Sequence, residues 1–361
     1  MRLSPIIVLI GCTSGSALDD ADTVGTRPTD ATPTADTADT ADTSTGIGPR
    51  ETWACAARVA TDFEDDGEVD YVVYEAYDPE RPELRLRYEE DAADDGRIGR
   101  WINNVYDQRG NMVLDEWGLG SGNPAQERTT FEWSDEDQEL SRRIDTNADG
   151  ADDLVYTWTY DGDGLALRHE QDLDGDGDAD YVFDFVNEGG LRRETRQDNG
   201  GDGTVDIVYQ YAYDDEDRPT TIEGRSAADV LAFYAVYTVL DANDSVRLEL
   251  SQDGDMVADE VEETYYDDQG RLIRDREDAT ADGHFERDFQ VLAFDDADRS
   301  TVYELVLGEI GALEYRRTTI TFERPAGPWL REEVGEVREV EDGPVISSYR
   351  RTRSWTCPTL P

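Results

Sequence analysis

The sequence predicts an all-β fold, an antiparallel array of about 10 β-hairpin units of about 27 residues each in one coiled or closed sheet. Three observations predict it: an aromatic-Asp pair recurs along the chain, an alternating apolar run precedes each pair, and an Asp/Gly turn follows. A β-propeller of five four-stranded blades, with two units to a blade, is the alternative fold.

The repeat occupies most of the chain between residues 51 and 361. Successive copies of the pair lie 26 to 29 residues apart, which indicates ten copies of one structural unit. The clear copies are Tyr77-Asp78, Tyr106-Asp107, Tyr160-Asp161, Tyr213-Asp214, Tyr266-Asp267 and Phe294-Asp295, and the weaker ones are Ser134-Asp135, Val186-Asn187, Leu240-Asp241 and Phe322-Glu323.

The segment before each pair has the periodicity of a β-strand. In LVYTWTY (154–160), Leu154, Tyr156 and Trp158 alternate with Val155 and threonines, so the large apolar residues share one face. An aromatic stripe of this kind favours core packing over a ligand-stacking surface.

The segment after each pair has the composition of a tight turn. Asp107 precedes Gly110 by three residues, as Asp161 precedes Gly164. A type I turn favours Asp first, because its carboxylate caps turn amides, and Gly fourth, because Gly accepts a positive φ. A second strand, such as RLIRDRED (271–278), then completes a hairpin.

Three of these units resemble the YD repeats of the Rhs family, whose pattern is Tyr-Asp-x-x-Gly-Arg-Leu. The segments are YDDQGRLIR (266–274), YDGDGLALR (160–168) and YDQRGNMVL (106–114). The resemblance implies long antiparallel sheets that coil into shells or strips. The repeat period is longer here, because each unit carries an additional acidic loop.

The acidic loop between hairpins is best preserved in DLDGDGDAD (172–180), with acids at positions 1, 3, 5 and 9 and Gly at position 6. Hard oxygen ligands around a sharp turn suit Ca²⁺. The pattern is similar to the calcium loops of EF-hands, dockerins and FG-GAP repeats. The predicted metal ligands, loop by loop, are Asp62, Glu64, Asp66 and Asp70; Asp145, Asn147, Asp149 and Asp153; Asp172, Asp174, Asp176 and Asp180; Asp198, Asp202 and Asp206; Asp253, Asp255 and Asp259; and Asp278, Asp282 and Glu286.

Position 12, which supplies a bidentate acid in EF-hands, holds Tyr156, Phe183 or Tyr209 in these loops. We therefore expect several weak structural Ca²⁺ sites, with Kd of about 10⁻⁴ to 10⁻³ M. The alternative is a set of Asp/Gly turns in an acidic chain. The same register in several loops favours the metal.

The N-terminal segment predicts export and a lipid anchor. A short apolar run ends in Leu9-Ile10-Gly11-Cys12, which resembles the lipobox of bacterial lipoproteins, so residues 1–11 would be a signal peptide and Cys12 the lipidated residue. Residues 12–50, rich in Thr, Asp and Ala, read as a disordered tether, and residues 51–361 as the hairpin repeat domain. The expected location is the outer membrane or cell surface.

Two further cysteines, Cys55 and Cys357, flank the repeat domain. An exported chain meets an oxidising compartment, which predicts a disulfide between them. Because a flat sheet of about twenty strands would separate these residues by roughly 90 Å at about 4.8 Å per strand, the disulfide requires a coiled or closed sheet.

Composition narrows the function. With 86 acidic and 33 basic residues, the formal net charge of −53 disfavours nucleic acid as a partner. His169 and His284 lack a partner motif and are expected on the surface, so no catalytic residues are assigned. We expect a calcium-stabilised, non-catalytic surface lipoprotein with a structural or adhesive role and a glycan or protein ligand. The alternatives are an Rhs-like shell or toxin-associated protein and a carbohydrate-active enzyme using paired carboxylates.

Overall fold

The computed structural model describes residues 55–63, 66–81, 83–92, 94–294, 300–307, 314–322, 330–338 and 345–355. The chain divides into two units, Met1–Gly46 and Ile47–Pro361, and the described residues belong to the second. The expected signal peptide (1–11), Cys12, the expected tether (12–50), Glu64 and Cys357 lie outside the described residues.

The described chain is all-β, as predicted. None of its residues forms a helix with the length and apolarity needed to cross a lipid bilayer. The strands are β1 (Ala56–Asp62), β2 (Tyr71–Tyr77), β3 (Arg85–Asp91), β4 (Arg100–Tyr106), β5 (Met112–Leu119), β6 (Glu127–Trp133), β7 (Glu139–Asp145), β8 (Leu154–Tyr160), β9 (Ala166–Asp172), β10 (Tyr181–Glu188), β11 (Leu191–Asn199), β12 (Ile207–Tyr213), β13 (Pro219–Ser226), β14 (Leu231–Val239), β15 (Val246–Ser251), β16 (Glu260–Tyr266), β17 (Leu272–Asp278), β18 (Arg287–Phe294), β19 (Ser300–Leu307), β20 (Glu314–Phe322), β21 (Leu330–Arg338) and β22 (Val345–Trp355).

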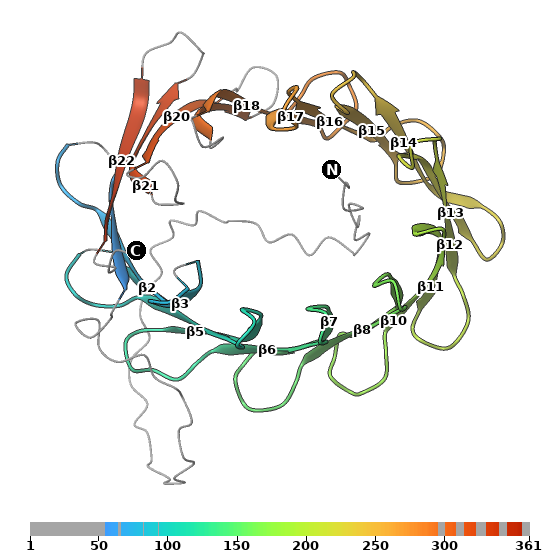
Figure 1. The fold of residues 1–361 in the computed structure, drawn as a ribbon, viewed down its shortest axis with the longest axis horizontal. Helices are drawn as coiled ribbons and strands as arrows, with labels where there is room; N and C mark the ends of the chain where they lie inside the picture. The colour runs from blue at the N-terminus through green and yellow to red at the C-terminus, as the bar shows by residue number, and fades with distance from the viewer. Residues whose placement is uncertain are drawn as a thin grey trace, which may run out of the picture. The chain divides into compact units, whose positions relative to one another are not determined.

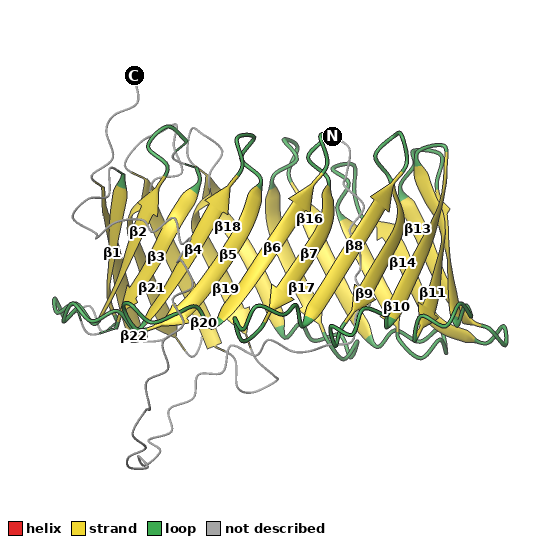
Figure 2. Cartoon of the chain, turned by 90° about the horizontal axis from the view of Figure 1, so that it is seen from below, coloured by secondary structure: helices red, strands yellow, loops and turns green. Residues whose placement is uncertain are grey.

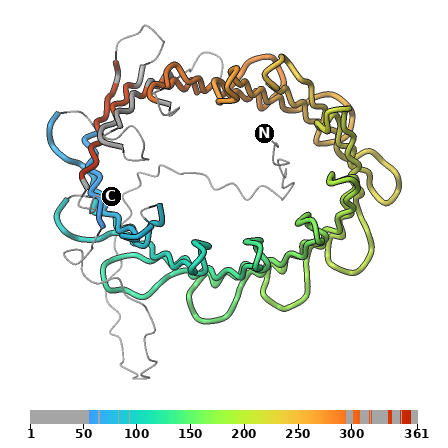
Figure 3. The backbone as a smooth tube through the Cα atoms, in the orientation of Figure 1, coloured from blue at the N-terminus to red at the C-terminus, as the bar shows by residue number. Residues whose placement is uncertain are grey.

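The sheet closes on itself. Each strand pairs antiparallel with the next one along the chain, and β1 pairs with both β2 and β22, with Val59 opposite Arg353. In Figure 1 and Figure 3 the first strand lies beside the last and completes a ring. This confirms the closed hairpin array. The alternative of separate propeller blades is wrong, because all the strands belong to one sheet.

The two rims of the ring carry different connections (Figure 2). Within the described connections, even-numbered strands lead into the short turns that follow the aromatic-Asp pairs, and odd-numbered strands, apart from β5 and β13, lead into the acidic loops. Because antiparallel strands alternate in direction, all the acidic loops gather on one rim. These longer loops swing outward from the ring, while the short turns bend toward its inside (Figure 1).

The outer face of the sheet carries ion pairs. Asp172, at the end of β9, accepts hydrogen bonds from amides of its own loop, which bends outward, so its face is the outer one. Alternation along β9 places Arg168 and Glu170 on that face too. Arg168 contacts Glu170 at 2.7 Å and Asp184 of β10 at 2.8 Å.

The inner face is aromatic. Trp158 pairs with His169, and His169 with Phe183, on the face opposite to Asp172. The strand register continues in this way around the closed sheet, so it places one set of aromatic side chains on the inner face. Most of these side chains are half-buried. Further aromatic residues on this face are Tyr71, Tyr88, Trp117, Phe131, Tyr156, Tyr209, Tyr211, Phe233 and Tyr237.

A compact apolar cluster forms on one part of this inner face, where β12 to β15 lie side by side. Its buried members are Tyr209, Ile222, Phe233, Ala235, Leu248 and Leu250. Elsewhere in the described wall most strand residues are half-buried, because a single-layered ring has no second sheet to cover it. Strand pairing, ion pairs and ordered loops therefore carry much of the stability.

The short turns form as the sequence predicts. The carboxylate of Asp107 accepts hydrogen bonds from the amides of Arg109, Gly110 and Asn111 at 2.8 to 2.9 Å. Gly110 has a φ of +100°. In a weaker copy Ser134 supplies the cap, and Asp137 takes the fourth position with a φ of +63°. That copy is Trp133-Ser134, one residue earlier than the pair predicted from the sequence.

In three of the pairs, those of Tyr106, Tyr160 and Tyr213, the tyrosine has a role that its sequence context does not reveal. Its hydroxyl donates to a backbone carbonyl 21 residues earlier, in the preceding hairpin: Tyr160 to Glu139 at 2.8 Å and Tyr213 to Arg192 at 2.8 Å. In the fifth copy Asn187 donates in its place, so Asn187 occupies the tyrosine position. These bonds tie the hairpins that contain them to the hairpin before.

Candidate metal centre in the acidic loops

In five of the predicted loops the first acid is the centre of a recurring hydrogen-bond pattern. Asp172 accepts bonds from the amides of Gly175 at 2.7 Å and Gly177 at 2.9 Å. Because Asp172 is 9% exposed, its carboxylate is held inside the loop rather than in water. Equivalent amide bonds reach the first acids of four other loops, Asp62, Asp145, Asp198 and Asp278.

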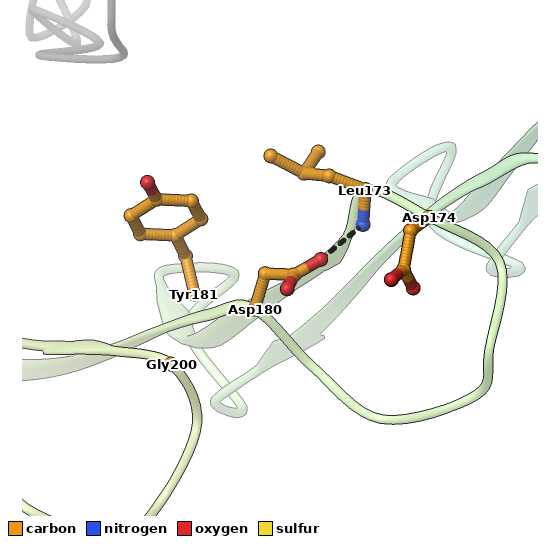
Figure 4. Close-up of a pocket in the computed structure, with 5 residues that line it drawn as sticks. All are labelled: Leu173, Asp174, Asp180, Tyr181 and Gly200. Atoms are coloured by element: carbon orange, nitrogen blue, oxygen red, sulfur yellow. Dashed lines mark hydrogen bonds between the residues drawn. The ribbon is translucent and has the colours of Figure 1, made fainter.

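The ninth residue closes the loop. The amide of Leu173 donates to the Asp180 carboxylate at 2.7 Å (Figure 4). In the preceding loop, Thr146 donates to Asp153 from both its amide and its hydroxyl. The Thr146 side-chain and backbone hydrogen bonds lower the pKa of Asp153, so this carboxylate stays ionised.

Two loops bring three acids together. One carboxylate oxygen from each of Asp172, Asp174 and Asp176 lies within 4.8 Å of the others. The same holds for Asp278, Asp282 and Glu286. Among the residues that the structure describes, the remaining predicted loops do not meet this distance, although they share the fold of the loop. Three anionic oxygens this close repel one another unless a cation lies between them.

The loop 198–206 contains an unsatisfied acid. Asp198 is 8% exposed, and its Oδ2 accepts from Gly203 at 2.7 Å. Within the described chain, no group donates to its buried Oδ1. In the loop of Asp145 the corresponding oxygen accepts from Asp149 at 3.1 Å. A buried carboxylate oxygen without a partner costs free energy, and a cation would satisfy it.

The loop 91–99, which keeps only part of the acidic pattern, shows which residues the turn requires. In the loop 91–99, Asp91 accepts from Asp95 at 3.1 Å and Gly96 at 2.8 Å. This loop has Ala93 at position 3 and Gly99 at position 9. The turn therefore forms without acids at those positions. The acid at position 3 in other loops is therefore not required by the turn, and its presence fits a cation.

Two loop positions adopt the left-handed conformation, and the sequence suggests only one of them. Gly at position 6 was expected, and Gly177 has a φ of +94°. Position 4 is also left-handed, at Gly175 with +69° and at Ala148 with +54°. In the loop 251–259 Met256 replaces Gly at position 6 and still takes a φ of +68°.

A shallow pocket opens beside the best-preserved loop. Its lining is Leu173, Asp174, Asp180, Tyr181 and Gly200 (Figure 4). The two carboxylates belong to one loop, while Gly200 belongs to the next.

One expectation about histidine is wrong. His284 is exposed on its loop, as expected, but His169 is 5% exposed and lies in the inner wall. Its ring stacks on Trp158, with centroids 4.6 Å apart, and on Phe183 at 5.6 Å. The aromatic stripe of the strands buries the imidazole, which a motif search does not reveal.

The predicted disulfide concerns the point of ring closure. Cys55 is buried and disulfide-bonded, and Cys357 lies outside the described residues. The nearest described pair is Ala57 opposite Trp355, two residues from each cysteine. Pairing of Cys55 with Cys357 stays a prediction.

Comparisons with known proteins find no matching family model and no matching curated protein. Solved structures do match. Over 81% of its length the chain is similar to 16% of a chain described as TcdB2-TccC3 without its hypervariable C-terminal region, with a TM-score of 0.41 and 11% identity. Over 84% of its length it is similar to 17% of a chain from the Tc holotoxin pore of Photorhabdus luminescens, with a TM-score of 0.38 and 12% identity.

A porin-like protein from Bacteroides uniformis is similar over 85% of this chain and 98% of its own, with a TM-score of 0.27 and 11% identity. The chain spans less than a fifth of the two toxin chains that it matches. At these scores and identities the likenesses leave the activity and partners of this chain undecided.

Proposed function

We propose that the chain is a non-catalytic surface scaffold, a closed ring of β-hairpins that Ca²⁺ stiffens along its acidic rim. The orphaned, buried Oδ1 of Asp198 carries the proposal, because it lies in a loop whose two other acids fit the same ligand pattern. The converging acids of the Asp172 and Asp278 loops support it.

The donor set suits Ca²⁺ better than Mg²⁺ or a transition metal. Both groups of converging side chains consist of Asp and Glu alone, so they offer carboxylate oxygens and no thiolate or imidazole ligand. Ca²⁺ accepts six to eight oxygens in flexible geometry, whereas Mg²⁺ demands a near-ideal octahedron. Without a bidentate acid at position 12, the affinity would be that of an extracellular module.

The test is thermal unfolding of the full chain in chelator, in 1 mM Ca²⁺ and in 1 mM Mg²⁺. A ligand that binds only the folded state must raise its stability. At ten times Kd each site adds about 1.4 kcal/mol, so several sites should raise the Tm by several degrees in Ca²⁺. Coincident curves in Ca²⁺ and chelator would reduce the loops to turns and overturn the proposal.

The aromatic inner wall favours a second candidate, a shell that encloses or binds a guest. Half-buried rings such as Tyr156 and Tyr211 face into the ring, where a guest could cover them. In a chain with a net charge of −53, cationic or neutral guests fit better than anionic ones. Both candidates are non-catalytic scaffolds. They differ in whether the binding surface is the outer face or the inner face of the ring.

Site-specific photocrosslinking in the source cells distinguishes the two candidates. A photoreactive residue replaces Tyr156 on the inner face, or Arg143 on the outer face as the control. A macromolecule captured only from position 156 supports a shell. Capture only from position 143 supports an outward-facing adhesive scaffold and contradicts the shell.

A further inference from the structure

Neighbouring acidic loops touch through their backbones. The amide of Gly200, at position 3 of its loop, donates to the carbonyl of Asp180, at position 9 of the loop before. The next contact along the rim repeats this, with Ala227 donating to Asp206 at 2.8 Å. An earlier one joins Gly120 to Gly99 at 3.0 Å. The ninth residue of a loop therefore supports the loop that follows.

Position 4 makes these contacts tight. A Cβ added to Gly201 would overlap the carbonyl oxygen of Ala179, and one added to Gly175 would overlap that of Asp152. A Cβ on the position-6 glycines Gly177 and Gly203 would meet nothing within 4 Å. Glycine at position 4 is thus required by the neighbouring loop. The left-handed conformation alone does not require it, because Ala148 adopts the same conformation with a Cβ.

We infer that the loops 145–153, 172–180 and 198–206 bind their cations cooperatively. This inference rests on the proposed Ca²⁺ function and adds its regulation. A cation held by Asp172, Asp174 and Asp176 orders the loop that ends at Asp180, and the carbonyl of Asp180 accepts a hydrogen bond from the amide of Gly200. The next loop is then partly ordered before its own cation arrives, which raises its affinity.

Electrostatics works in the opposite direction. Each bound dication reduces the negative potential that attracts the next one, which favours weaker binding at a neighbour. At physiological ionic strength the Debye length is about 8 Å, so exposed charges on adjacent loops are partly screened. The backbone contacts are unaffected by salt. Coupling through contacts should therefore be most evident at 0.15 M salt or above.

The experiment follows one loop while its neighbour is altered. In the full chain labelled with ¹⁵N-glycine, the amide of Gly203 reports on the loop 198–206, and the amide of Gly67 reports on the loop 62–70. Each donates to the first acid of its loop, Asp198 or Asp62. Ca²⁺ is titrated in 0.15 M salt. Asp176→Ala should raise the midpoint at Gly203 about fivefold, the lower end of ordinary coupling, and leave Gly67 unchanged.

Two further variants isolate the contact. Asp178→Ala removes the same charge from the same loop without removing a predicted ligand, so it should shift the Gly203 midpoint much less. In a Gly201→Ala background, which separates the loops, Asp176→Ala should no longer shift Gly203.

The failures of the two proposals are distinguishable. If neither Gly67 nor Gly203 responds to Ca²⁺ in the native chain, the proposed function fails. If both respond but Asp176→Ala and Asp178→Ala shift Gly203 equally, the loops bind independently and the inferred coupling is wrong.

Discussion

The imidazole of His169 stacks on the indole of Trp158, with ring centroids 4.6 Å apart and planes 7° apart. Phe183 lies on the other side at 5.6 Å. Burial, together with the positive charge of Arg142, lowers the pKa of His169 to about 4. The Nε2 atom has no hydrogen-bond partner within the described chain. The inner wall thus holds a neutral histidine at neutral pH.

The ring should lose stability as His169 is driven toward protonation. An unfolded His has a pKa of about 6.5. Between pH 6.5 and 4 the unfolded chain binds this proton and the folded chain does not, so the free energy of unfolding falls as the pH falls. Above pH 6.5 the group adds no pH dependence. After allowance for solvent screening, the expected loss is about 1 to 2 kcal/mol by pH 4.

Urea unfolding of the native chain and of His169→Phe at pH 7.5 and 4.5 measures this effect. The phenyl ring keeps the stack and cannot be protonated, so the variant should gain about 1 to 2 kcal/mol on the native chain over this interval. His284→Phe, on an exposed loop, is the matched control. A parallel decline of native chain and His169→Phe would contradict the prediction.

A single acid in the best-preserved loop should account for part of the Ca²⁺ response. Asp176→Ala removes one of three converging oxygens, so Ca²⁺ should stabilise this variant about 1 kcal/mol less than the native chain. Asp163→Ala is the control, because Asp163 is exposed in a hairpin turn on the other rim. Thermal unfolding with Ca²⁺ and with chelator gives the increments. If Ca²⁺ stabilises both variants by the same amount, Asp176 is not a ligand of the site.

Local chemistry made the hairpins predictable from the sequence. Alternation in LVYTWTY and the Asp-x-x-Gly spacing each depend on a few neighbouring residues, so β8 and its turn could be read directly. The hydrogen bond from a tyrosine hydroxyl to a carbonyl 21 residues earlier could not be predicted, because it joins two hairpins. The side chain of Asn187 or Trp133 can also donate this bond in place of a tyrosine. That freedom explains why the sequence pattern places two weaker copies one residue away from their structural position.

The candidate site was predictable in part for the same reason. The spacing of Asp172, Asp174 and Asp176 gives their convergence, because all three lie on one short loop. The requirement for Gly201 arises from Ala179 on the preceding loop. Contacts between loops depend on how closely β10 and β12 approach, which is a property of the assembled sheet.

Met256 should be a correctable defect. It holds the left-handed position that Gly occupies in the other loops, with a φ of +68° and its side chain 60% exposed. This conformation costs an L-residue about 1 to 2 kcal/mol, and the extra flexibility of an unfolded Gly offsets part of the gain. Met256→Gly should therefore stabilise the chain by about 0.5 kcal/mol or more in urea unfolding.

The adjacent residue provides the control for that substitution. Val257 is 64% exposed and does not have a positive φ, so Val257→Gly adds flexibility without relieving strain and should destabilise the chain. If both substitutions change stability by the same amount, strain at Met256 is not significant.

Ring closure should depend on one buried carboxylate. Glu75 of β2 has a side chain only 7% exposed, and it forms an ion pair with Arg353 of β22 across β1. Arg85 approaches the same carboxylate at 3.7 Å. Glu75→Gln removes the negative charge that the guanidinium groups of Arg353 and Arg85 both contact at the seam. Loss of a buried partner costs about 3 kcal/mol, so urea unfolding should shift by that amount and amides of β1 and β22 should exchange faster.

An exposed pair gives the scale for this effect. Arg97 contacts Asp95 at 3.7 Å with its side chain 90% exposed, and Arg97→Ala should change stability by less than about 0.5 kcal/mol. If Glu75→Gln costs no more than Arg97→Ala, the ion pair does not hold the seam. Closure would then rest on the six residue pairs of β1 with β22 and on the predicted disulfide, and reduction of that disulfide should then open the ring.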